Sequence, residues 1–190
     1  MAKLESYIKL SVHVNNSGLN SLKNSLTTLE FNAEVIKAAT SENHSMIALM
    51  DCSFIAKSGE KTFGLDQFYN GSHNRVERGL EVSLVAVVDV ETEVGYGLLA
   101  EQTFDQTFCP DLTRMDYYLH HLEITQPQLP TQVRYLAVDG AYAKEPFVTG
   151  VRALNDHLLD TFISTLGLSP TLIKSHPNYQ NLLSYGVIAA

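Results

Sequence analysis

The segment LEVSLVAVVDV, residues 80–90, constrains the fold more than any other part of the sequence. It is rich in valine, whose branched β-carbon favours the extended conformation, and its nearly continuous apolar run is typical of a strand inside a sheet. The turn ETEVG then leads to YGLLAEQTF, residues 96–104, which we expect to return as an antiparallel partner. The chain is therefore predicted to build around a β-hairpin with 80–90 as a central strand.

Composition supports one globular domain. The chain has 190 residues, of which 45% are hydrophobic, enough for a substantial core. It contains no run of the roughly 18 to 20 apolar residues that a membrane span needs, and its start lacks the apolar centre of a secretory signal. We therefore expect a cytoplasmic protein without a membrane partner. The two cysteines, Cys52 and Cys109, are too few for a disulfide framework and are expected to be reduced thiols.

The net charge of -8 is unevenly distributed. Acidic and basic residues balance over residues 1–80, whereas residues 81–190 hold five Lys/Arg against thirteen Asp/Glu. A domain dedicated to nucleic acid usually has a basic excess, so composition alone argues mildly against DNA as a partner.

Two apolar segments carry an aspartate at or near their ends. SMIALMDCSFI, residues 45–55, contains Asp51, and RYLAVD, residues 134–139, ends at Asp139. A strand reached through a helix can pair parallel to the first strand, which would bring the two carboxylates out at one end, ~4.8 Å apart. Such a pair can share two cations, as phosphoryl-transfer sites require. A turn-forming Asp-Gly explains Asp139 about equally well.

Helices are expected around these strands. Thr113 and Asp116 form a capping-box pattern, and a later helix is predicted to begin near Glu145 with Pro146 in its first turn. Val35 and Ile36 could belong to an earlier amphipathic helix, while four glycines make 57–79 a predicted long loop. The predicted buried faces of the two later helices are Met115, Tyr118, Leu119 and Leu122, and Val151, Leu154, Leu158 and Phe162.

Other acids fit a shared site less well. Asp89 ends the strand antiparallel to the first one, so we expect it at the opposite end of the sheet as a turn residue. Glu101 finishes the third strand at the correct end, but it lies two strands from Asp51, or ~9 to 10 Å.

The combined pattern resembles the DDE transposases of bacterial insertion sequences. The matching pieces are DCSFIAKSG around Asp51, the segment GLDQFYNGSHNRVERGLEVSLVAVVDVET, and RYLAVDGAYAK around Asp139, within roughly residues 46–150. The resemblance implies an α/β, ribonuclease H-like mixed sheet, a three-strand meander plus a parallel strand, with flanking helices. It also implies DNA transposition by phosphodiester hydrolysis and strand transfer at a two-metal Mg²⁺ or Mn²⁺ site.

The same resemblance assigns roles to residues. Asp51 and Asp139 match the first and second metal-binding acids, insertion-sequence ends are the implied DNA partner, and a homo-oligomer is possible. A solvated, charge-balanced loop and a rim tyrosine are the simpler interpretations of the candidate DNA contacts. These candidates are Lys57, Lys61, His73, Arg75, Arg78, Tyr142 and Lys144.

One departure from the family is large. A third acid, a glutamate on a helix after a further strand, is expected beyond residue 163, yet residues 163–190 contain no Asp or Glu. We therefore divide the chain into a partly helical segment (1–44), a partial catalytic core (45–162) and an atypical tail (163–190). The hypothesis is a truncated or frameshifted transposase that cleaves no DNA. If the fifth strand is lost, RYLAV becomes an exposed edge.

Two alternatives stay open. An aspartate-nucleophile phosphohydrolase also begins with an apolar strand ending in aspartate, but it needs a second acid where Ser53 stands. A folded binding module without catalysis is the other. His120 and His121 add no metal site, because adjacent helical residues diverge, and we expect both at the surface.

Overall fold

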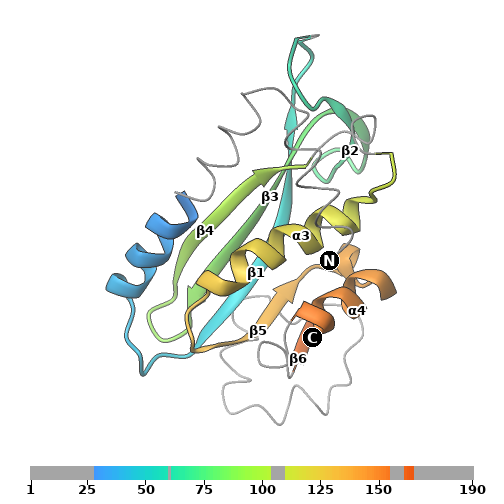
Figure 1. The fold of residues 1–190 in the computed structure, drawn as a ribbon. Coiled ribbons are helices and arrows are strands. Elements are labelled where there is room, and N and C mark those ends of the chain that lie inside the picture. Colours follow the sequence, from blue (N-terminus) through green and yellow to red (C-terminus); the bar gives the residue numbers. More distant parts are fainter. Residues whose placement is uncertain (1–27, 60, 104–109, 155–160, 165–190) are drawn as a thin grey trace.

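The computed structural model describes residues 28–59, 61–103, 110–154 and 161–164, and within this part of the chain six strands form one mixed sheet. Figure 1 shows the sheet with helices packed along one side. The strands are β1 (Met46–Ala56), β2 (Asp66–Asn70), β3 (Arg75–Asp89), β4 (Val94–Gln102), β5 (Val133–Val138) and β6 (Thr161–Ser164). The helices are an unlabelled one over residues 28–39, α3 (Arg114–Thr125), α4 (Glu145–Leu154), and the short 3-10 turns η1 (Gln126–Gln128) and η2 (Gly140–Tyr142).

The sheet combines an antiparallel and a parallel half. β3 pairs antiparallel with β1 along one edge and with β2 and then β4 along the other. β1 pairs parallel with β5, and β5 pairs parallel with β6. The predicted meander and its parallel fourth strand are therefore confirmed. β6 is also present and pairs with β5 on the side away from β1. β5 is therefore not the exposed edge that loss of this further strand would have produced.

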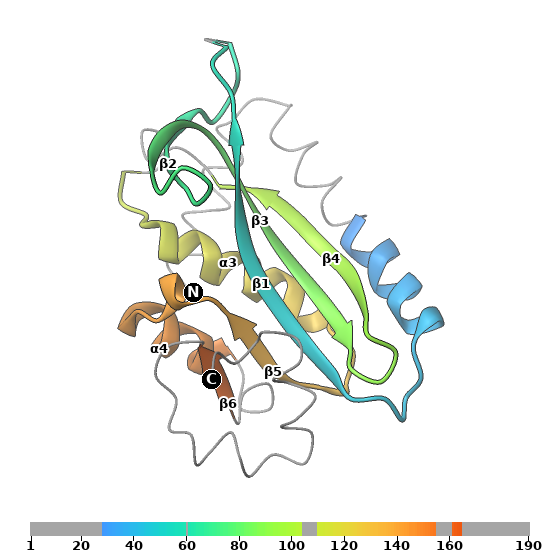
Figure 2. The same cartoon turned by 180° about the vertical axis from the view of Figure 1, so that it is seen from behind.

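The hydrophobic core lies between one face of the sheet and the helices. β3 alternates strictly, because every second residue from Gly79 to Asp89 is buried. α3 adds Tyr118 and Leu122 to this core, α4 adds Phe147 and Val151, and the helix over 28–39 adds Leu29 and Ile36. Figure 2 shows the opposite face, where no helix of the described residues crosses β1, β3 and β4.

The helix predictions are largely confirmed. The Thr113 hydroxyl accepts from the Asp116 amide at 3.3 Å, and the Asp116 carboxylate accepts from the Thr113 amide at 2.9 Å, completing the capping box. Phe162, predicted on the buried face of a helix, lies in β6 instead, and Leu158 falls outside the described residues. None of the described helices is both long and apolar enough to cross a membrane.

The predicted loop over 57–79 is wrong in its second half. β2 and the start of β3 occupy much of this segment and form a hairpin. Gly79 does not break the strand, because the Phe54 ring covers it so closely that an added Cβ would lie 2.4 Å from the ring. A glycine beneath a cross-strand aromatic ring stabilises a sheet rather than interrupting it.

Candidate functional site

Asp51 and Asp139 lie side by side on adjacent parallel strands. The register of β1 and β5 pairs Met50 with Val138, and both of these residues belong to the hydrophobic core. The residue after each of these is the aspartate: Asp51 continues β1, whereas Asp139 follows the last residue of β5 and keeps an extended backbone (φ -77, ψ 174). Because successive side chains alternate between faces, both carboxylates belong to the face opposite the helices, on strands ~4.8 Å apart.

The position of Asp51 within its strand differs from the prediction. β1 continues to Ala56, so Asp51 lies in the middle of the strand, whereas β5 ends immediately before Asp139. On its other side Asp51 pairs with Leu84 of β3, whose side chain is 41% exposed. The pair therefore stands on the open face of the sheet, at the level where the parallel neighbour stops, rather than at the rim.

Both carboxylates are exposed and only partly used by the protein. Asp51 accepts a hydrogen bond at Oδ1 from the Cys52 amide, and Asp139 accepts one at Oδ1 from the Ala141 amide, each at 2.8 Å. Within the described residues neither aspartate has a cationic partner, and each Oδ2 accepts no hydrogen bond. Carboxylate oxygens of this kind are the ligands that Mg²⁺ and Mn²⁺ prefer.

The layer beneath the pair is polar and buried. The Tyr142 hydroxyl donates to Cys52 Sγ at 2.9 Å, and the Tyr118 hydroxyl donates to Glu81 Oε1 at 2.7 Å. Tyr142 is only 3% exposed, so the prediction of a rim tyrosine is wrong. Burial raises the pKa of Cys52 to about 11 and also raises the pKa of Tyr142, so both groups stay protonated at neutral pH.

His121 is part of the core, contrary to the expected surface position. Its side chain is 2% exposed, and its Nδ1 shares a 2.9 Å hydrogen bond with the Ser83 hydroxyl on β3. Burial lowers the pKa of His121 to about 4, so the ring is neutral at physiological pH. Sequence reasoning missed this because His121 shares a helix face with Tyr118 and Leu122, which a polar residue normally avoids.

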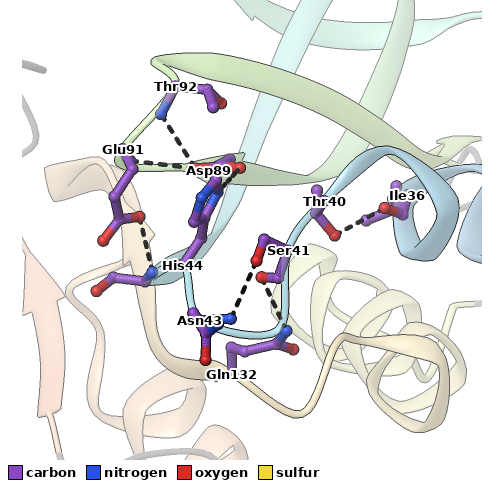
Figure 3. Close-up of polar contacts among 10 residues, drawn as sticks. Ile36, Thr40, Ser41, Asn43, His44, Asp89, Glu91, Thr92 and Gln132 are labelled. Carbon is purple, nitrogen blue, oxygen red and sulfur yellow. Dashed lines mark hydrogen bonds and ion pairs between the residues drawn. The ribbon is translucent and has the colours of Figure 1, made fainter.

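Figure 3 shows a second polar cluster at the opposite end of the sheet, around Asp89. Asp89 is 1% exposed, its Oδ2 lies 2.7 Å from His44 Nδ1, and its Oδ1 accepts from the Glu91 and Thr92 amides, both at 3.1 Å. Glu91 in turn accepts from the Ser45 amide at 2.7 Å. The prediction of Asp89 as a turn residue at this end is confirmed, while the role of His44 was missed.

Hydrogen bonding sets the charge states in this cluster. The hydrogen bond to Asp89 raises the pKa of His44, against the opposing effect of burial. Burial works against ionisation of Asp89, but the hydrogen bonds from His44 and Thr92 outweigh it and hold the pKa of that carboxyl below its usual value. Among the described residues, His44, Asp89 and Glu91 are the one group of three whose ligand atoms all lie within 4.8 Å of one another.

The candidate basic residues divide into two kinds. Arg75 Nε donates to Glu77 Oε1 at 2.6 Å, and His73 Nδ1 lies 3.0 Å from Glu77 Oε2. The hydrogen bond from Asn70 is the largest cause that lowers the pKa of Glu77 to about 2, and those from Arg75 and His73 lower it further. Arg75 and His73 are therefore engaged in contacts within the β2–β3 hairpin. The remaining candidates are exposed and form no ion pair with another described residue: Lys57, Lys61, Arg78 and Lys144.

Arg114, at the start of α3, was not singled out from the sequence. It lies 3.5 Å from Asp66 Oδ2 and 4.4 Å above the centre of the Phe68 ring. These contacts attach α3 to β2, so Arg114 is occupied within the fold. The sequence did not indicate these contacts of Arg114, because Asp66 and Phe68 fall in the segment that was predicted to be a loop.

A third acid does not join the aspartate pair within the described residues. Glu101 pairs with Ser83 of β3, which pairs in turn with Cys52 of β1, so Glu101 stands two strands away as predicted. Residues 165–190, where the third acid was sought, lie outside the described residues and contain no Asp or Glu. No protein-family model matches the chain, and a search of curated proteins found no relative.

Proposed function

We propose that this chain is a ribonuclease H-like catalytic core of the DDE transposase type, with Asp51 and Asp139 as the first two metal-binding acids and no third acid beside them within the described residues. The observation that carries the proposal is that Asp51 and Asp139 directly follow Met50 and Val138, which are paired in the parallel register of β1 and β5. The strand order β4-β3-β1-β5-β6, antiparallel in its first half and parallel in its second, is what such a core requires. The antiparallel neighbour β3 argues against the doubly wound sheet of an aspartate-nucleophile phosphohydrolase.

The two carboxylates fit half of a divalent metal site. Each has an oxygen without a hydrogen bond to the described residues, and their strands are close enough for a shared ion. Mg²⁺ or Mn²⁺ held there would supply the charge that activates a nucleophile and stabilises a leaving oxygen in phosphodiester chemistry. Lys57, Lys61, Arg78 and Lys144 are the groups we propose to contact DNA phosphates.

Within the part of the chain that the structure describes, no third carboxylate joins Asp51 and Asp139, and this limits the proposed function. Two exposed carboxylates bind a divalent cation weakly, and a site with two ligands leaves its geometry poorly defined. We therefore propose that the chain binds Mg²⁺ or Mn²⁺ weakly and does not cleave DNA. A binding module without catalysis is the second candidate, and it is favoured by the absence of a third carboxylate beside Asp51 and Asp139 within the described residues.

Metal binding and cleavage can be tested separately. Mn²⁺ titrated into ¹⁵N-labelled protein should broaden the amide signals next to Asp51 and Asp139, and Asp51→Asn or Asp139→Asn should abolish that broadening. Glu91→Gln, at the other end of the sheet, is the matched control and should leave it unchanged. If the wild-type signals do not broaden there, the metal site is wrong.

Cleavage is tested with the purified chain, supercoiled plasmid and Mg²⁺ or Mn²⁺. We expect no nicking above the level of the Asp51→Asn variant. Nicking that requires both aspartates would contradict the proposed inactivity and would imply that the remaining ligand comes from DNA or water.

A further inference from the structure

The segments that carry the two aspartates are joined beneath the sheet by one hydrogen bond. Cys52 directly follows Asp51 on β1, and Tyr142 is the last residue of η2, which Asp139 caps. The Tyr142 hydroxyl donates to Cys52 Sγ at 2.9 Å. Cys52 points to the core face while Asp51 belongs to the open face, so the bond lies directly under the carboxylates.

This contact is well supported by its surroundings. The Tyr142 ring packs against Tyr118 and Phe147, with ring centres 5.1 Å and 5.2 Å apart. The Tyr142 amide also donates to the Asp139 carbonyl at 3.2 Å, so a shift of the ring moves the backbone of Asp139. The paired register of β1 and β5 ends at Met50 and Val138, so the ladder does not extend to the aspartates.

We propose that Tyr142 is a positioning residue for the candidate metal site, which it serves by fixing the Asp139 turn against Cys52 and thereby setting the separation of the two carboxylates. Tyr142 does not reach the open face, and its hydroxyl is occupied by the thiol, so it is neither a ligand nor a proton donor to substrate. The inference rests on the proposed metal site and adds the device that holds its two halves in register.

Residues that orient metal ligands typically change metal affinity by 10-fold to 100-fold when they are altered. Tyr142→Phe deletes one hydroxyl and keeps the ring, and we expect about a 10-fold weaker Mn²⁺ affinity in the amide-broadening titration. Cys52→Ala removes the same bond together with the contacts of the thiol to Tyr118 and Ser83, and it should give at least as large a loss. Cys52→Ser keeps a hydrogen-bonding atom and should restore most of the affinity.

A matched variant distinguishes a positioning role of Tyr142 from a general contribution of its hydroxyl to stability. Thr125→Val deletes another buried hydroxyl, one that donates to the His121 carbonyl at 2.8 Å near the end of α3. We expect Tyr142→Phe and Thr125→Val to lower the melting temperature comparably, but only Tyr142→Phe to weaken Mn²⁺ binding. The double variant Tyr142→Phe/Cys52→Ala should lose no more affinity than Cys52→Ala alone, because Cys52→Ala already removes the bond between Tyr142 and Cys52.

The outcomes separate this inference from the proposed function. Wild-type Mn²⁺ binding that disappears in Asp51→Asn but is unchanged in both Tyr142→Phe and Cys52→Ala overturns the positioning role alone. Equal weakening by Thr125→Val also overturns it, because general destabilisation would then explain the effect. Absence of Mn²⁺ binding in the wild type overturns both.

Discussion

Acidic residues occupy two regions of the sheet, and the two regions differ in how many hydrogen bonds the protein donates to the carboxylates. At one end Asp89 is buried, and an imidazole and two backbone amides bind its oxygens. On the open face of the sheet, at the level where β5 ends, Asp51 and Asp139 are exposed, and each receives a single amide hydrogen bond. A carboxylate whose lone pairs are filled by the fold is part of the fold, whereas one with an open oxygen is available to an external cation.

The comparison also explains why proximity alone is a poor guide to a metal site. His44, Asp89 and Glu91 lie closer together than any other such group among the described residues, yet their ligand atoms already bind one another or the backbone. Within the residues that the structure describes, Asp51 and Asp139 have no third carboxylate beside them, but each keeps an Oδ2 that accepts no hydrogen bond. Metal binding at the first group would require breaking existing hydrogen bonds.

The largest expected effect concerns stability. Asp89→Ala should lower the free energy of unfolding by about 3 kcal/mol, because it leaves the His44 ring and two backbone amides without their acceptor. Asp51→Ala, at an exposed position, should change it by less than about 0.5 kcal/mol. Urea denaturation monitored by circular dichroism measures both, and equal losses would erase the contrast between the two ends.

The next effect is stabilisation by metal. At a free Mg²⁺ concentration ten times its dissociation constant, mass action predicts about 1.4 kcal/mol of added stability. Asp139→Asn should remove this gain, and Glu91→Gln should retain it. Thermal unfolding with and without Mg²⁺ is the measurement, and a gain lost only in Glu91→Gln would move the metal to the Asp89 end.

A smaller effect is the pH dependence of the Asp89 cluster. Since the folded pKa of His44 is raised above 6.5, its contribution is complete below that pH and is lost as pH rises through the folded value. The depressed pKa of Asp89 means that its contribution is present above 3.8 and is lost as pH falls through the folded value. The melting temperatures of wild type and His44→Gln should therefore differ most below pH 6.5, and the difference should shrink as the pH rises through the folded pKa of His44. A constant difference would show that His44 acts without its charge.

The smallest effect is expected from Glu91→Gln. The Glu91 carboxylate accepts from the Ser45 amide at an exposed position, and glutamine keeps an acceptor there. We expect less than about 0.5 kcal/mol of lost stability in urea. A loss as large as that of Asp89→Ala would mean that the cluster depends on the second negative charge.

Features with local causes could be predicted from the sequence. The Thr113 capping box, the β3–β4 hairpin and the strand ending before Asp139 each follow from neighbouring residues. The parallel placement of Asp139 beside Asp51 followed from the strand order along the chain. These predictions were confirmed because propensity, alternation and connectivity agreed.

The remainder depended on contacts between distant residues. Gly79 looked like a strand breaker until the Phe54 ring was placed over it. His121 and Tyr142 are polar residues that became buried because Ser83 and Cys52 on the sheet offered them partners. The pairing of His44 with Asp89 joins residues from two different strand ends, and neither one predicts the other.

The parallel pairing of β1 with β5 has a consequence for how the molecule folds. In the meander, β3 and β4 are joined by a short turn, and β1 reaches β3 through residues 57–74, which include β2, whereas β5 reaches β1 only after the whole meander and α3 have been made. Contacts between residues distant along the chain form late and slow the rate of folding. During synthesis on the ribosome, Asp51 is therefore in place on a formed hairpin before Asp139 emerges, and the carboxylate pair is among the last features of the domain to assemble.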